Sequence, residues 1–167
     1  MKKVFLVFVL TFLFKFGFSQ KLKINSESQI TIDTIVTFDS LSSVEIYNGI
    51  KKWSSANFNN IKEVTIYDTP DEIQFRYIQN VENGYGSSTT PIKTTLTIKI
   101  KTGKIRAEFS KMSWAEHGNT YESVLIKNDG TFRDNKPSRS MLLSTENNFI
   151  TCIQNIYKAI MVKEDNW

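Results

Sequence analysis

Four successive segments in the middle of the chain alternate apolar and polar residues. They span residues 61–67, 72–81, 92–101 and 104–112. A two-residue period is typical of strands that have one buried and one solvated face. Turn-forming residues separate the segments, and four such strands in succession predict an antiparallel meander.

The same alternation assigns side chains to the two faces of the predicted sheet. A two-residue turn at 102–103 would place Lys99 opposite Arg106 and Thr97 opposite Glu108, all on the outward face. The inward positions are Val64, Ile66, Ile73, Phe75, Tyr77, Leu96, Ile98, Ile100, Ile105, Ala107 and Phe109.

A strand and a helix are predicted before the meander. Residues 30–38 are rich in β-branched side chains, which favours a strand. Ser42 and Glu45 fit a capping box, and apolar positions at helical spacing continue to Phe58, so we predict a helix over 43–57. Trp53 on this helix is interpreted as a core residue rather than a ligand-stacking one.

The C-terminal third is predicted to be irregular before it ends in a helix. Residues 113–143 form an irregular connection with a short strand at 121–126, and apolar residues at helical spacing predict a helix over 145–162. Trp114, His117 and Tyr121 in the connection could edge a pocket, although aromatic packing is the simpler interpretation.

The first residues have the pattern of a secretory signal peptide. Lys2 and Lys3 precede an apolar run from Val4 to Phe14, and small residues precede Gln20. That run is far shorter than the roughly 20 residues needed to span a bilayer. We therefore predict cleavage after Ser19, a flexible N-terminus over 20–29, and a periplasmic or secreted protein with no transmembrane segment after signal removal.

Removal of this segment changes the charge balance. The chain carries 21 Lys and Arg and 17 Asp and Glu, and three of the lysines lie within residues 1–19. The remaining chain is close to neutral, and its outward sheet face is mostly Thr, Gln and Ser. A nucleic-acid partner is therefore not expected, since such partners need basic surfaces.

Few residues are available for catalysis or metal binding. Cys152 is the only cysteine and His117 the only histidine, which excludes an intrachain disulfide and a Cys/His metal cluster. Asp68, Asp71 and Glu72 cluster in a turn, where acidic residues are ordinary. We expect no catalytic residues, no cofactor and no metal, so an enzyme is the less favoured interpretation.

The predicted order of strand, helix, four strands and helix is that of one half of the TATA-binding-protein (TBP) fold. Within residues 32–113, the motifs Val44-Glu-Ile-Tyr47, Lys52-Trp53 and Ile98-Lys-Ile-Lys-Thr-Gly-Lys-Ile-Arg106 resemble an exported Bacteroidota domain of unknown function, number 4468. The resemblance implies an α+β, TBP-like fold: one domain over 30–167, with a curved antiparallel sheet of about five strands and two helices on one face. It implies export but no activity.

The sequence therefore favours a non-catalytic binding or structural module of the cell envelope. Its working surface would be the outer sheet face with Arg76, Lys99, Arg106 and Glu108, and its partner an envelope protein or an anionic surface. Like charges opposite each other destabilise a sheet, so either Glu108 balances them or an acidic partner does. The alternative is a small-ligand-binding protein or hydrolase with a pocket near 113–143.

Overall fold

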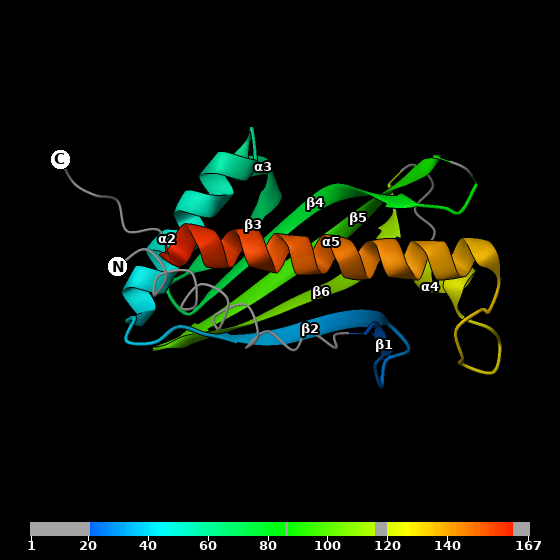
Figure 1. The fold of residues 1–167 in the computed structure, drawn as a ribbon, viewed down its shortest axis with the longest axis horizontal. Coiled ribbons are helices and arrows are strands. Elements are labelled where there is room, and N and C mark those ends of the chain that lie inside the picture. Colours follow the sequence, from blue (N-terminus) through cyan, green and yellow to red (C-terminus); the bar gives the residue numbers. More distant parts are fainter. Residues whose placement is uncertain (1–20, 86, 116–119, 162–167) are drawn as a thin grey trace, which may run out of the picture.

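An antiparallel sheet forms the centre of the fold, and two long helices cover one of its faces (Figure 1). The structure is a computed structural model, and it describes residues 21–85, 87–115 and 120–161. The described strands are β1 (Lys23–Ile24), β2 (Ile30–Thr37), β3 (Thr65–Thr69), β4 (Glu72–Glu82), β5 (Thr89–Lys101) and β6 (Lys104–Trp114). The described helices are α2 (Ser43–Asn57), α3 (Ile61–Val64), α4 (Tyr121–Leu125) and α5 (Lys136–Met161).

The sheet order is β1-β2-β6-β5-β4-β3, and every neighbouring pair is antiparallel. The meander β3 to β6 follows the chain, and β2 pairs with β6 at its far side. β1 adds a sixth strand within the segment that was predicted to be flexible. The α+β class and the TBP-like arrangement of the sheet and two helices are therefore confirmed.

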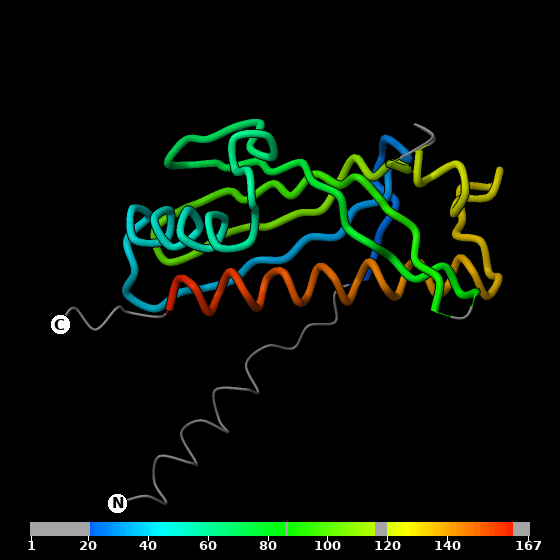
Figure 2. Tube along the Cα trace, turned by 90° about the horizontal axis from the view of Figure 1, so that it is seen from above, coloured from blue at the N-terminus to red at the C-terminus, as the bar shows by residue number. Residues whose placement is uncertain are grey.

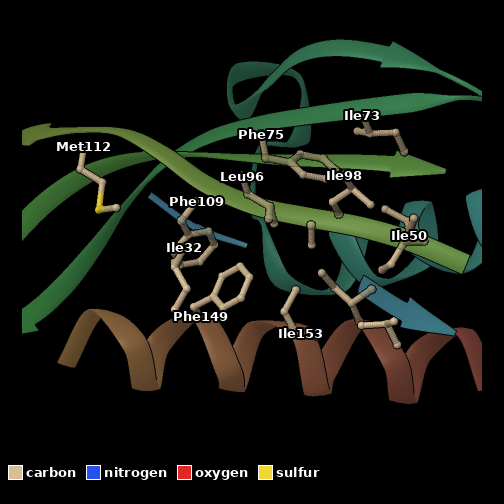
Figure 3. Close-up of a cluster of buried hydrophobic side chains, with 14 of the residues drawn as sticks. Ile32, Ile50, Ile73, Phe75, Leu96, Ile98, Phe109, Met112, Phe149 and Ile153 are labelled. Atoms are coloured by element: carbon tan, nitrogen blue, oxygen red, sulfur yellow. The ribbon is translucent and has the colours of Figure 1, made fainter. Parts of the chain in front are cut away.

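A row of neighbouring residues across β4, β5 and β6 shows that both long helices pack on the same face of the sheet. Phe75, Leu96 and Phe109 lie opposite one another on β4, β5 and β6. Trp53 of α2 contacts Phe75 at a ring-centroid distance of 5.7 Å, and Phe149 of α5 contacts Phe109 at 4.9 Å. Figure 3 shows this core between the sheet and α5, and Figure 2 shows α5 along one side of the sheet.

The first helix agrees with its predicted bounds. Ser42 caps it: the Ser42 hydroxyl accepts a hydrogen bond from the Glu45 N–H (3.2 Å), and the Glu45 carboxylate accepts one from the Ser42 N–H (2.8 Å). Because this reciprocal pair satisfies two backbone donors, the start of the helix is defined locally.

Three assignments of helices and strands from the sequence are wrong, and the first concerns residues 61–67. Residues 61–64 form the helical turn α3, so the strand begins only at Thr65. The register then shifts between Thr65 and Tyr67. A shift of this kind moves a side chain to the other face, and Ile66, predicted to point inward, is 51% exposed.

The other two errors lie in the segment predicted to be irregular. Residues 121–125 are helix α4 rather than a strand, because the Thr120 hydroxyl accepts a hydrogen bond from the Ser123 N–H (3.3 Å) and starts a turn. Helix α5 begins at Lys136 rather than Thr145. The Asn135 side chain accepts a hydrogen bond from the Ser138 N–H (2.9 Å) at this start.

Candidate functional site

The open face of the sheet carries the predicted charged residues in the predicted register. Lys99 lies opposite Arg106, and Thr97 lies opposite Glu108. Of the two residues in the connecting turn, only Gly103 has a positive φ (71°), a conformation that glycine adopts without steric cost. The turn therefore preserves the parity of both strands.

The two like charges are balanced, although by other residues than expected. Lys99 Nζ lies 3.9 Å from Glu72 Oε2 on β4, and Arg106 Nη2 lies 3.1 Å from Asp33 Oδ2 on β2. Lys99 on β5 therefore pairs with a residue of β4, and Arg106 on β6 pairs with a residue of β2, so the two acidic partners lie on the outer sides of the two cations. The expectation that Glu108 balances them is wrong, because among the described residues Glu108 forms no ion pair.

A hollow of about 190 Å³ lies over this cluster. The lining residues are Glu72, Gln74, Thr97, Lys99, Arg106 and Glu108. The side chains of Lys99 and Arg106 are 64% and 56% exposed, so water screens their charges. The arrangement offers hydrogen-bond donors and acceptors and both signs of charge, but nothing activated for chemistry.

Arg76 belongs to a different part of the same face. It lies opposite Thr95 on β5 and lines a second hollow, of about 390 Å³. The structure therefore does not bring Arg76 together with Lys99 and Arg106. The other residues lining this second hollow are Glu27, Ser28, Gln29, Lys111, Met112, Ser113, Thr120 and Glu122.

The aromatic residues predicted to edge a pocket pack in the core or lie outside the described residues. Tyr121 is fully buried, and its hydroxyl lies 3.1 Å from the Met141 carbonyl and 2.8 Å from the Thr145 hydroxyl. Burial raises the pKa of Tyr121. Trp114 packs against the Tyr121 ring at 6.4 Å, and His117 is outside the described residues. The second hollow is bordered instead by Ser113 and Thr120.

A third hollow, of about 380 Å³, was missed by the sequence analysis. It lies where β4 meets α2 and α5, and its lining residues are Trp53, Asn57, Phe58, Tyr77, Ile78, Gln79, Asn80, Asn148, Thr151, Cys152 and Asn155. The spacing of Asn148, Thr151 and Asn155 along one face of a helix is the signal that could have indicated it.

Two ionisable groups in this third hollow remain neutral. Burial raises the pKa of the Cys152 thiol to about 12, against a smaller opposing effect of the hydrogen bond from Tyr77. Burial also raises the pKa of Tyr77. Cys152 is therefore a thiol rather than a nucleophilic thiolate at neutral pH. Across residues 21–85, 87–115 and 120–161, no group of His, Cys, Asp and Glu side chains could hold a metal ion.

The fold and its open sheet face define a TBP-like α+β domain, and comparison with known proteins agrees. A TBP-like protein from Parabacteroides distasonis is similar in structure, with a TM-score of 0.64 and 15% identity over 81% of this chain and 95% of that one. A DUF4468 family protein from Bacteroides ovatus has a TM-score of 0.60 and 11% identity over 86% of this chain and 92% of its own.

The resemblance drawn from the sequence motifs is thus confirmed at the level of fold. No family model matches the sequence, and no curated protein matches it. Within the described ranges, no helix is both long and apolar enough to cross a membrane.

Proposed function

We propose that this protein is an exported, non-catalytic binding module that contacts its partner through the open face of its sheet. The observation that carries the proposal is the arrangement of the layers. Both long helices pack on one face, and the other face presents a hollow lined only by polar and charged side chains.

The chemistry of the hollow favours a protein surface over a simple anion. The hollow combines two acidic residues, Glu72 and Glu108, with the two cations Lys99 and Arg106, and the cations already have acidic neighbours. An isolated phosphate would have to compete with Glu72 and Asp33. A partner with charges of both signs can instead meet each group with its opposite, which gives specificity more than affinity.

The test is affinity capture by immobilised residues 20–167 from envelope extracts of the source bacterium. The double variant Lys99→Thr, Arg106→Thr should lose the captured partner. The matched control is Lys101→Thr, Lys104→Thr, which removes the same charge from the exposed pair next to the turn, outside the hollow. Equal capture by both double variants would remove this face from consideration.

A second candidate function rests on the second hollow, which borders the segment where a ligand pocket was predicted. Arg76 and Lys111 supply positive charge there, and Glu27 and Glu122 supply negative charge. The Glu122 carboxylate also accepts a hydrogen bond from the Ile30 N–H (2.9 Å). This arrangement suits a small zwitterion. Thermal-shift measurements with amino acids should show stabilisation that Arg76→Ala abolishes, and no shift would exclude it.

A further inference from the structure

Strand β4 is longer than the edge strand that covers it. β3 pairs with β4 only from Thr69 opposite Glu72 to Thr65 opposite Phe75. From Arg76 to Glu82, β4 is paired with β5 on one side and with no described strand on the other. A free strand edge exposes backbone donors and acceptors to which another strand can add.

Hydrogen bonds establish which backbone groups of β4 point to this edge. The Asn80 carbonyl accepts a hydrogen bond from the Asn148 side chain (2.9 Å), and the Glu82 N–H donates one to the Ser144 hydroxyl (3.0 Å). Both partners lie on α5, so α5 covers this end of the edge. At the other end, the backbone of Glu72 contacts Thr69 of β3.

Ile78 lies between these two covered ends. Backbone groups alternate between the two sides of a strand, and the pairing of β4 with β5 has no register shift between 72 and 82. The N–H and C=O of Ile78 therefore point to the free edge, like those of Asn80 and Glu82. No hydrogen bond among the described residues reaches either group of Ile78. Ile78 as a whole is 57% exposed.

The third hollow lies beside this open part of the edge. Ile78 and Asn80 line it from β4, and Asn148, Thr151 and Asn155 line it from α5. A neighbouring hollow of about 330 Å³ continues between α2 and α5, and the two share Trp53, Asn57 and Asn155. We call the third hollow, beside Ile78, the β4-edge groove; the neighbouring hollow adjoins it between α2 and α5 and has Lys52 and Lys158 in its lining.

The walls of the third hollow are uncharged but rich in amides. Its lining includes the side chains of Asn57, Gln79, Asn148 and Asn155, and no acidic or basic residue. The Gln79 side-chain nitrogen is buried and has no hydrogen-bond partner. Peptide groups match such amides in both donors and acceptors.

We propose that the β4-edge groove binds an extended, uncharged peptide segment of a partner protein, which adds to β4 at Ile78 as a short strand in line with β3. Strand addition would use the unbonded N–H and C=O groups of Ile78, since such binding gains its affinity from main-chain hydrogen bonds. The absence of charged walls explains why the segment is uncharged, because an ionised group would lose hydration without gaining a partner.

The first test selects peptides from a random phage-displayed library on immobilised residues 20–167. Enriched peptides should be poor in charged residues and rich in β-forming ones. Peptide binding should slow hydrogen exchange at the Ile78 amide of the wild-type protein by at least tenfold. Failure to enrich any sequence, or bound peptides that leave this amide unprotected, would overturn the proposal.

The second test uses variants of the edge. Ile78→Pro removes the outward N–H at a position where an edge strand tolerates proline, and should weaken binding of a selected peptide at least tenfold. Ile78→Val keeps the N–H and should bind as wild type. Equal binding by both would contradict strand addition. If the proline variant does not fold, Asn155→Leu, with Gln154→Leu as the control outside the groove, answers the same question.

Two further controls separate this groove from other interpretations. The Lys99→Thr, Arg106→Thr variant should bind selected peptides as wild type, because the open sheet face lies elsewhere; the two proposals can therefore fail independently. Chitotetraose, a neutral saccharide with amide groups, should not protect the Ile78 amide. If the saccharide binds the groove and selected peptides do not, the site is a glycan site and the peptide proposal is wrong.

Discussion

Single residues separate the interpretations that the sequence left open, and Trp53 is the clearest case. Its helical position suited either a core residue or a ligand-stacking residue. The residue is 5% exposed, and its ring contacts Phe58 and Phe75 edge-on, at 5.5 and 5.7 Å between ring centroids. Although one edge of Trp53 borders the β4-edge groove, most of the ring is buried in the core.

Replacing Trp53 with alanine should therefore destabilise the fold strongly. Removing a large buried aromatic ring loses its burial and leaves a cavity, which costs about 3–5 kcal/mol. Urea unfolding followed by circular dichroism measures the loss. A variant whose free energy of unfolding stays within about 1 kcal/mol of wild type would contradict the core assignment.

Asp68 links β3 to α2 and makes stability depend on pH. Its carboxylate accepts a hydrogen bond from the Tyr47 hydroxyl (2.9 Å) and forms an ion pair with Lys51. Burial acts to raise the pKa of Asp68, but the hydrogen bonds from Lys51 and Tyr47, together with the Lys51 charge, outweigh it and lower the pKa. The folded protein therefore holds the proton of Asp68 more weakly than the unfolded chain.

The contribution of Asp68 should be present at neutral pH and lost in acid. It is complete above the unfolded pKa of about 3.9 and disappears as the pH falls through the lower, folded pKa. Asp68→Asn should cost about 0.5–1 kcal/mol at pH 7, since the pair is largely solvated, and less at pH 3. Urea unfolding at both pH values tests this; a difference that grows in acid would reverse the assigned sign.

At the scale of elements, the contact between α2 and α5 depends on one glycine. A Cβ atom at Gly49 would lie 2.7 Å from Ile160 Cγ1 and 2.8 Å from Ile160 Cα. The backbone atom cannot move without shifting α5. Glycine within a helix costs up to about 1 kcal/mol relative to alanine, so its presence in α2 is explained by this close approach.

Gly49→Ala should therefore destabilise the protein despite its better helix propensity. Overpacking typically costs about 1–3 kcal/mol, which outweighs the gain in propensity. The control is Asn48→Ala at the neighbouring exposed position, which should be neutral or slightly stabilising. Chemical unfolding of both variants tests the contact, and a stabilised Gly49→Ala would show that the helices can separate freely.

The elements that were predicted correctly are those with a complete local signal. α2 has its reciprocal cap at Ser42 and Glu45, and β5 and β6 have long alternation around one turn. The start of α5 was missed although Asn135 and Pro137 are common in the first turn of helices. Ser144, a residue type common at helix N-caps, directly precedes the predicted start at 145, but it lies within α5 and its hydroxyl accepts a hydrogen bond from the Glu82 N–H. The short helices α3 and α4 are too brief to show a period.

At the scale of the whole molecule, the alternation of apolar and polar residues predicted the open face of the sheet but not the free edge of β4. The register of Lys99 with Arg106 follows from parity and turn length alone. The position of Arg76 away from them, and the groove beside Ile78, depend on where β3 ends and where α5 packs. Local periodicity predicts neither the position of Arg76 nor the groove, because both result from contacts between distant segments.

Export is also a property of the whole chain, and it remains a prediction. The apolar run preceded by Lys2 and Lys3 should direct cleavage after Ser19. Mass spectrometry of the native protein should then show an N-terminus at Gln20, as glutamine or its cyclised form. A major species that retains Met1 would contradict it.

The position of β2 beside β6 has a consequence for the order of folding. A two-residue turn joins β5 to β6, so these two strands pair across a short loop. β2 is separated from β6 along the chain by α2, α3, β3, β4 and β5, so its pairing with β6 has to close a long loop. Closing long loops slows folding. We therefore expect Ile98→Ala, in the hairpin, mainly to slow refolding, and Ile32→Ala, in β2, mainly to speed unfolding. Stopped-flow kinetics on both variants measures this, and equal φ-values at the two positions would show that the sheet forms all at once.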